Sequence, residues 1–384
     1  MPTPTTALQF APVSFADLPG WSANDPRNAL AAFRRSCAVL NARSGTKNMG
    51  GAGYAGTAGD WQAVCAAVPA DAGSAAAARV FFVRWFTPVQ VSAGDAADGI
   101  FTGYYEPELR GSRTKHGAYQ TPVYGLPGDV ITVDLGLFHI DVTNKQIAGF
   151  LRGSHLVPYP SRAEIDAYGL PHAKTLLYAD DPISVFFLHI QGSGRVRLDD
   201  GSVVRVAYAG QNGRPYTAIG RTLIARGVPR EGMSMQAIRR WLKANPQGAR
   251  EVMETDQSYV FFKEAPVGNA ALGSEGAQGV ALTPEASLAV DLHLHALGAP
   301  FFVDATAPDA DPAKPDRPFR RLLIAQDTGG AIRGTVRGDV FWGFGANAES
   351  VAGRMKASGK FYVLLPKAVA ARLGTQKDFS GAAP

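Results

Sequence analysis

The chain has 384 residues, enough to bury a sizeable core and to form two domains. Hydrophobic residues make up 46% and charged residues 18%, which is ordinary for a globular protein and excludes a disordered one. The net charge of +5 favours an anionic partner, and a cell-wall polymer, nucleic acid or a membrane surface would satisfy it equally. No cluster of lysine and arginine with interleaved aromatic residues supports nucleic acid, so we expect no nucleic-acid partner.

The first part of the chain has no visible targeting signal and then a helical pattern. Residues 1–20 contain neither the basic nor the uninterrupted apolar segment of an export signal, and no run of about 18 apolar residues occurs anywhere. Between residues 24 and 86, apolar residues from Leu30 onwards recur at helical spacing. Two further short helices are expected, one around Trp61 and one over residues 75–86.

The two cysteines, Cys37 and Cys65, both lie in these predicted helices. Two buried thiols and one disulfide fit the pattern about equally well. A disulfide would favour an oxidising compartment.

Short strands dominate the rest of the chain. The 43 glycines and 26 prolines indicate many turns, and therefore a β-rich body rather than a helical bundle. Strands are expected over residues 99–105, 130–134, 183–191, 203–208, 259–263, 301–304, 321–325 and 360–365. Helices are expected over residues 162–168, 217–226 and 235–244, and loops over residues 268–279 and 309–318.

Two aspartates near the C-terminal end form the most informative pattern. Asp327 ends a strand-like run and opens a Thr-Gly-Gly turn, and Asp339 follows twelve positions later, close to Phe341 and Trp342. We expect the two carboxyl groups to lie close together, with Asp339 against apolar surface. Because burial disfavours the charged form, such a carboxyl can keep its proton near neutral pH and donate it to a leaving oxygen.

Several segments far apart in the sequence carry a family resemblance. They are Phe101–Pro107, His189–Gly194, Ser258–Phe262 and Leu322–Phe344, together with Asp291 in the sequence Leu-Ala-Val-Asp. In these residues and in their order, the chain resembles the membrane-bound lytic murein transglycosylase A (MltA) family, with its C-terminal three-aspartate (3D) domain.

The resemblance implies a mainly β fold with flanking helices. It implies a double-psi β-barrel domain, made of residues 1–107 and 246–384, that includes the N-terminal helices and the three-aspartate region. A smaller β domain, specific to the family, would be inserted at residues 108–245. A groove between the two domains would hold a glycan strand.

The resemblance also implies an activity, that of a peptidoglycan lytic exotransglycosylase. Such an enzyme cleaves the β-1,4 bond between N-acetylmuramic acid and N-acetylglucosamine without water, because the C6 hydroxyl of the sugar attacks its own anomeric carbon. The product carries 1,6-anhydromuramic acid. One carboxyl, by position in the motif that of Asp339, would act first as the acid and then as the base.

The other two aspartates have structural alternatives. Asp327 can accept backbone N–H bonds and fix its turn, or it can tune the pKa of Asp339. Asp291 is similar, and in a helix beginning at Thr283 it would simply face solvent. For Asp339 itself, the alternative is a surface turn aspartate after a glycine.

Seven residues are considered for the surroundings of the glycan, of which Tyr104 and Tyr105 are alternatives for one stacking position. Tyr104 and Tyr105 follow a glycine, so that one ring can stack on a sugar while the other packs in the core. Gln191 and Ser193, in a Gly-rich turn, suit hydroxyl and acetamido groups. The remaining three candidates are Glu106, as an additional carboxylate, and Phe341 and Trp342, as rings that pack against a sugar.

No cofactor and no metal are expected, because His293 and His295 lack a cysteine or carboxylate cluster at ligand spacing. We expect a monomer that acts on peptidoglycan glycan strands in the periplasm. The resemblance adds outer-membrane association through a lipid anchor that this sequence does not contain. Two alternatives are a non-catalytic expansin-like wall-binding protein and, if Glu106 lies opposite Asp339, a two-carboxylate hydrolase.

Overall fold

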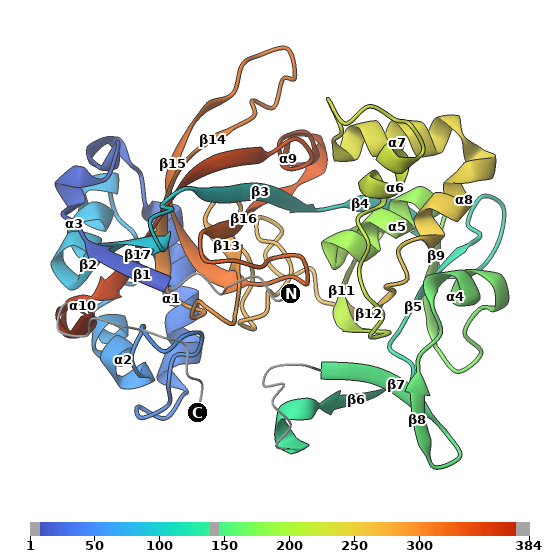
Figure 1. Cartoon of the computed structure of the whole chain (residues 1–384), viewed down its shortest axis with the longest axis horizontal. Coiled ribbons are helices and arrows are strands. Elements are labelled where there is room, and N and C mark those ends of the chain that lie inside the picture. Colours follow the sequence, from blue (N-terminus) through green and yellow to red (C-terminus); the bar gives the residue numbers. More distant parts are fainter. Residues whose placement is uncertain (1–7, 139–145, 374–384) are drawn as a thin grey trace. The chain divides into compact units, whose positions relative to one another are not determined.

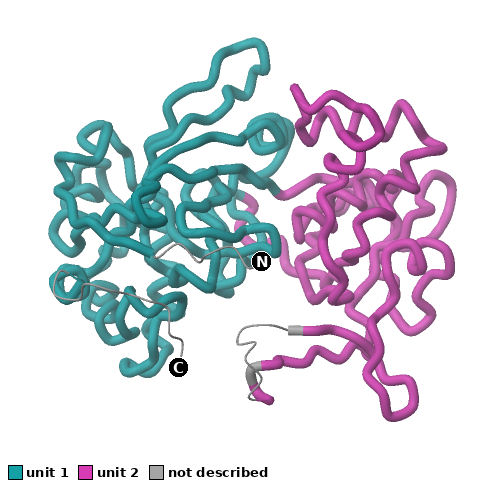
Figure 2. Tube along the Cα trace, in the orientation of Figure 1, with its two compact units in different colours: residues 1–105, 271–384 teal, residues 106–270 magenta. Residues whose placement is uncertain are grey.

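The computed structural model describes residues 8–138 and 146–373 (Figure 1). The chain forms two compact units, which Figure 2 shows in different colours. Unit 1 comprises Met1–Tyr105 and Ala271–Pro384, and unit 2 comprises Glu106–Ala270. Unit 2 is therefore an insertion in the sequence of unit 1.

A closed barrel of six strands forms the centre of unit 1. Neighbouring strands pair in the order β17-β14-β15-β13-β16-β3, and β17 pairs again with β3 to close the sheet. The barrel strands are β3 (Gly99–Glu106), β13 (Ser287–Val290), β14 (Pro300–Ala307), β15 (Arg317–Asp327), β16 (Arg337–Phe344) and β17 (Lys356–Pro366). Two more strands, β1 (Leu8–Pro12) and β2 (Phe86–Ala93), extend the sheet from β17.

Aromatic and branched side chains fill the barrel. Phe101, Phe301 and Phe361 are fully buried, and the rings of Phe301 and Phe361 lie 4.4 Å apart. Burying one such side chain contributes roughly 2 kcal/mol. The strand patterns predicted over residues 301–304, 321–325 and 360–365 fall on β14, β15 and β17, because β-branched and aromatic residues favour the buried pleated surface.

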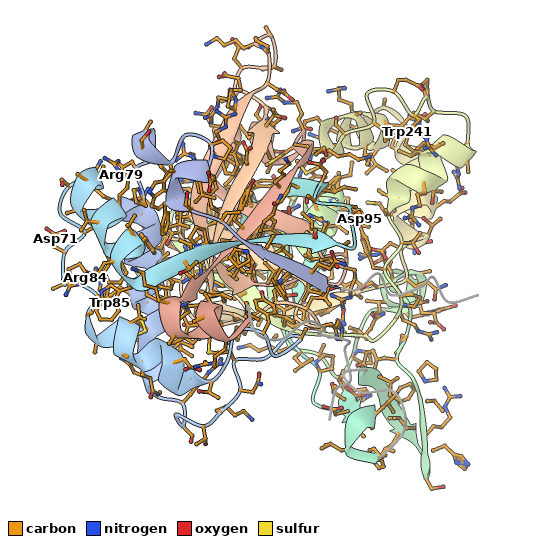
Figure 3. The ribbon with its side chains drawn as sticks, turned by 60° about the vertical axis from the view of Figure 1, so that its left-hand side comes forward. Asp71, Arg79, Arg84, Trp85, Asp95 and Trp241 are labelled. Atoms are coloured by element: carbon orange, nitrogen blue, oxygen red, sulfur yellow. A yellow bond between two sulfur atoms is a disulfide. The ribbon has the colours of Figure 1, made fainter. Side chains whose placement is uncertain are left out.

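Helices flank the barrel strands in unit 1. They are α1 (Arg27–Asn41), α2 (Ala58–Ala66), α3 (Ala75–Trp85), α9 (Gly345–Ala352) and α10 (Lys367–Leu373). Ser74 caps α3 by accepting a hydrogen bond from the Ala77 amide, and the last turn places Arg84 over the ring of Trp85 (Figure 3). Short 3-10 helices are found at Phe15–Asp17 and Trp21–Ala23 in this unit, and at Leu135–Phe138 in unit 2.

A disulfide joins Cys37 of α1 to Cys65 of α2. Of the two alternatives that the sequence left open, the bridge is therefore the one that the structure contains. It closes a loop with a sequence separation of 28, for which the loss of chain entropy in the unfolded state predicts a stabilisation of about 3.6 kcal/mol.

Unit 2 contains a six-stranded sheet in the order β12-β11-β10-β4-β9-β5 and a three-stranded sheet in the order β6-β7-β8. The strands are β4 (Glu108–Ser112), β5 (Thr121–Tyr124), β6 (Ile131–Asp134), β7 (Gln146–Arg152), β8 (His155–Pro158), β9 (Thr175–Ala179), β10 (Ser193–Leu198), β11 (Val203–Gln211) and β12 (Val260–Ala265). The helices are α4 (Arg162–Tyr168), α5 (Pro182–Gln191), α6 (Ile219–Ala225), α7 (Met235–Ala244) and α8 (Pro246–Glu254). Val185 and Leu188 of α5 belong to the core of the larger sheet.

One predicted strand is wrong, because residues 183–191 form helix α5. The side chain of Asp181 accepts a hydrogen bond from the Ile183 amide, and Pro182 occupies the first turn. Gly192 ends the helix at φ 79°, a conformation that favours glycine. The apolar run by itself does not distinguish a buried strand from a buried helix, and the residues at its two ends carry the information that does.

The predicted fold class is confirmed: the chain is mainly β, with a closed barrel and a second β domain. No helix in the described part of the chain combines the length and the apolar character that a membrane span requires.

Candidate active site

Strand β13 brings Asp327 and Asp339 close together. Ala289 of β13 pairs with Asp327 of β15 on one side and with Asp339 of β16 on the other. Directly paired residues project to the same face of a sheet, and two strand spacings place the two Cα atoms about 10 Å apart. Ala289 is the residue between them in the sheet, and its side chain is small and buried.

Strand β3 supplies one hydroxyl donor to each of these aspartates. The Thr102 hydroxyl donates to Oδ1 of Asp339 at 2.6 Å, and the Tyr104 hydroxyl donates to Oδ2 of Asp327 at 2.8 Å. The two donors are two positions apart on a strand, so they share one face. All four side chains are partly exposed, so a ligand can reach them.

Gly103 separates the two donors for a steric reason. A Cβ atom at this position would lie 2.6 Å from the Trp342 ring and 2.9 Å from the Ala352 Cα atom. Only glycine therefore fits here, and its presence lets β3 lie close to Trp342 and Ala352.

Burial raises the pKa of Asp339 above its ordinary value. The charge of Arg337 and the hydrogen bond from Thr102 act against this rise, and the negative charge of Asp327 adds to it. Burial also raises the pKa of Asp327, against hydrogen bonds from Tyr104 and from the Ala277 amide. The direction predicted for Asp339 from its apolar neighbours agrees with this shift, although burial within the barrel, not ring contact alone, is its largest cause.

Phe341 and Trp342 are buried. The Phe341 ring packs 5.2 Å from the Tyr104 ring, while Trp342 packs 5.3 Å from Phe319 and donates from Nε1 to Met355 Sδ. Burial leaves neither ring open to a sugar in this structure. Their contribution to the site is the apolar surroundings beneath Tyr104, and Tyr104 itself is the accessible ring. Tyr105 is buried, so one tyrosine is accessible and its neighbour belongs to the core.

Asp291 follows β13 and is buried, so the helix and solvent exposure considered for it are wrong. Its Oδ2 atom accepts a hydrogen bond from the Gly334 amide at 2.9 Å, and Oδ1 accepts one from the His293 amide at 3.1 Å. Gly334 lies in the connection between Asp327 and Asp339, so Asp291 ties that connection to the barrel.

His295 holds the same connection. Its Nε2 atom is 2.8 Å from the Thr335 carbonyl, and its Nδ1 atom is 2.8 Å from the Tyr54 hydroxyl. Because a carbonyl only accepts, Nε2 carries the hydrogen and Nδ1 accepts from Tyr54. Burial lowers the pKa of His295 to about 4, which keeps the ring neutral.

The other three predicted residues belong to unit 2. Glu106 is fully buried, and its carboxylate accepts hydrogen bonds from Arg195 at 2.9 Å and from Arg205 at 2.7 Å. This arrangement makes Glu106 one member of a buried ion-pair cluster. Gln191 ends α5 and Ser193 begins β10, and both are partly exposed.

Sequence reasoning did not assign a role to Thr102, Ala289 or Arg337. Thr102 lies in the segment Phe101–Pro107, which carries part of the family resemblance. Its spacing of two from Tyr104 on a predicted strand indicates that the two side chains lie on the same face. Arg337 donates from Nη2 to the Thr102 hydroxyl at 2.8 Å. No residue type or spacing marks Ala289, because its importance depends on the register of three strands.

Comparisons with known proteins agree with this geometry. Residues 100–263 match the MltA specific insert domain, and residues 286–365 match the 3D domain. Membrane-bound lytic murein transglycosylase A of Vibrio cholerae is 34% identical over 284 residues, which cover 72% of this chain and 68% of that protein. The Escherichia coli K12 protein of the same name is 34% identical over 270 residues, or 69% of this chain and 65% of that protein.

Two solved structures are similar as well. The crystal structure of membrane-bound lytic murein transglycosylase from Agrobacterium tumefaciens has a TM-score of 0.83 and 32% identity, over 95% of this chain and 99% of that one. The structure of E. coli MltA with bound chitohexaose has a TM-score of 0.62 and 27% identity, over 88% and 90% of the two chains. With a curated relative at this identity and both domain matches in order, the chain belongs to the membrane-bound lytic murein transglycosylase A family.

Proposed function

We propose that this protein is a lytic transglycosylase that cleaves the β-1,4 bond between N-acetylmuramic acid and N-acetylglucosamine in peptidoglycan. The observation that carries the proposal is Asp339, a partly exposed carboxyl with a raised pKa and a fixed hydroxyl donor. The names of the relatives and the chitohexaose bound to one of them support a glycan substrate.

In this proposal Asp339 is the single acid and base. It donates its proton to the glycosidic oxygen, and the bond from that oxygen to the anomeric carbon breaks. The C6 hydroxyl oxygen of the muramic acid then bonds to the anomeric carbon and releases its proton to the Asp339 carboxylate. The products are a chain end with a free hydroxyl and a 1,6-anhydro ring, no water is consumed, and Asp339 returns to its starting state.

Two observations favour one working carboxyl over the acid and base pair of a hydrolase. Both carboxylate oxygens of Asp327 already accept a hydrogen bond, Oδ2 from the Tyr104 hydroxyl and Oδ1 from the Ala277 amide. The Glu106 carboxylate forms ion pairs with the guanidinium groups of Arg195 and Arg205. Asp327 then acts through its charge, by raising the pKa of Asp339 and by stabilising positive charge at the anomeric carbon.

Mass spectrometry of digested sacculi tests the reaction. We expect soluble muropeptides that end in anhydromuramic acid, and muropeptides with reducing ends would instead identify a hydrolase. We expect Asp339→Asn to abolish turnover and to leave the melting temperature and chitohexaose binding unchanged, because the amide has nearly the same shape but cannot deliver the proton. Wild-type turnover in this variant would contradict the assignment, and binding to sacculi without any soluble product would favour the expansin-like alternative.

The proposed compartment is the periplasm. The Cys37–Cys65 disulfide supports an oxidising environment, and the relatives carry the name membrane-bound. Monomeric state stays a prediction.

A further inference from the structure

The Thr102 hydroxyl is engaged on both sides. It accepts a hydrogen bond from Nη2 of Arg337 at 2.8 Å and donates to Oδ1 of Asp339 at 2.6 Å. A hydroxyl has a single hydrogen to donate. No other acceptor for that hydrogen lies within hydrogen-bond distance among the described residues, so the Asp339 bond is where it goes.

Arg337 favours donation of the Thr102 hydrogen to Asp339. Its Nη1 atom donates to the Gly338 carbonyl at 2.5 Å and reaches the Ile100 carbonyl at 3.5 Å, so the guanidinium is anchored to the backbones of β16 and β3. A cation beside a hydroxyl oxygen makes that hydroxyl a better donor and a poorer acceptor. If Asp339 instead carried its proton on Oδ1, the Thr102 hydroxyl would lose its charge-assisted acceptor and face a much weaker one, a loss of about 1 kcal/mol for a partly exposed group.

We infer that Thr102, held by Arg337, is the positioning residue that makes Oδ1 of Asp339 a permanent acceptor and Oδ2 the oxygen that carries the catalytic proton. This inference rests on the proposed function. The proton leaves Oδ2 for the glycosidic oxygen, and Oδ2 later receives the proton of the C6 hydroxyl. Negative charge that develops on the carboxylate strengthens the bond from Thr102, so the hydroxyl contributes more after proton transfer than before it.

Other charged and polar groups around Asp339 do not compete for this role. Asp327 lies across β13 with Tyr104 on its Oδ2 atom, and it influences Asp339 only through its charge. Arg337 favours the charged form of Asp339 through its positive charge. Thr102 is therefore the side chain that assigns the two oxygens different tasks.

Thr102→Val tests the inference, because valine keeps the shape and removes the hydroxyl. Loss of a hydrogen bond to the charged form raises the pKa of Asp339 by about one unit. Since the productive enzyme holds Asp339 protonated, kcat/KM falls as the pH rises through that pKa. We expect the high-pH limb of the kcat/KM profile on sacculi to move up by about one pH unit, and the maximum to fall about tenfold.

Thr102→Ser is the matched control, because it restores the hydroxyl. We expect its pH profile to lie at the wild-type position, with its maximum within about threefold of wild type. Chitohexaose binding, measured by titration calorimetry, should be unchanged in both variants, because neither removes a group that contacts the glycan in this scheme. Arg337→Gln serves as a second route if the valine variant does not fold, and its high-pH limb should move in the same direction.

The outcomes separate this inference from the proposed function. If Asp339→Asn is inactive but the pH profile of kcat/KM for Thr102→Val is not shifted, the role of Thr102 is overturned and the proposed reaction stands. A serine variant as impaired as the valine variant also overturns it, because packing and not the hydroxyl would then be the cause. An active Asp339→Asn variant overturns the proposed function itself.

Discussion

Tyr104 donates its hydroxyl hydrogen to Oδ2 of Asp327 at 2.8 Å, across 223 positions of sequence. Burial raises the pKa of Tyr104 well above its usual value, so the hydroxyl keeps its hydrogen at every working pH. The pair thereby holds the second aspartate in one orientation beside Asp339.

Tyr104→Phe should lower kcat/KM on sacculi about tenfold, because it removes one charge-assisted hydrogen bond from Asp327. The phenyl ring keeps its packing against Phe341, so we expect the free energy of unfolding to fall only by the lost hydrogen bond, about 1–2 kcal/mol. Tyr362→Phe is the control, because Tyr362 is an aromatic residue of β17 in the same unit, outside the aspartate cluster. Equal activity of the Tyr104 variant and this control would contradict a role for the hydroxyl.

Ala289→Leu should disturb the two carboxyl groups, because it places a larger side chain at the buried position that pairs with both aspartates. Overpacking at this buried position costs about 1–3 kcal/mol in the free energy of unfolding. We expect turnover to fall more than tenfold while the variant remains folded at 25 °C.

Ala289→Gly removes the side chain at this position and gives the comparison. It should cost about 0.5–1 kcal/mol in stability through backbone entropy but retain activity within about threefold. The measurements are urea unfolding and the release of soluble muropeptides. If both variants lose activity in proportion to their stability, the size of the side chain at this position is not the reason.

Because of His295, the free energy of unfolding should decrease as the pH is lowered below 6.5. The pKa of His295 is about 4 in the folded chain and 6.5 in the unfolded chain, so well above pH 6.5 the ring is neutral in both states. As the pH falls below 6.5, the unfolded chain binds a proton that the folded chain does not, and stability is lost progressively down to about pH 4. At pH 5 this loss is about 2 kcal/mol.

Comparison with His295→Gln isolates this contribution, because other groups titrate in both proteins. Urea unfolding at pH 7.5 and pH 5.0 should show a loss in the wild type that exceeds the loss in the variant by about 2 kcal/mol. Parallel losses in the two proteins would mean that His295 is not the group responsible.

Local patterns predicted the strands well but not the residues that complete the site. The runs over residues 321–325 and 360–365 are buried strands whose composition already indicates their structure. The aspartates were found because a turn motif marks them. Thr102 and Asp339 are separated by 237 positions, and their contact depends on the order of strands in a closed sheet, which no local pattern encodes.

Helix α5 shows a case in which composition alone does not predict the type of element. Its apolar composition was compatible with either structure, and the information that decided between them was in the residues at its two ends. The predicted domain boundaries and the predicted groove stay predictions.

The last strand of the barrel has a consequence for how the chain folds. β17 pairs with β3 at Lys356 and Thr102, residues more than 250 positions apart, and it also pairs with β2 and β14. The sheet therefore cannot close until the chain has been released as far as Pro366, the end of β17. Contacts of such long range make closure slow, so the assembly of the aspartate cluster, which shares those strands, is a late event in the maturation of this protein.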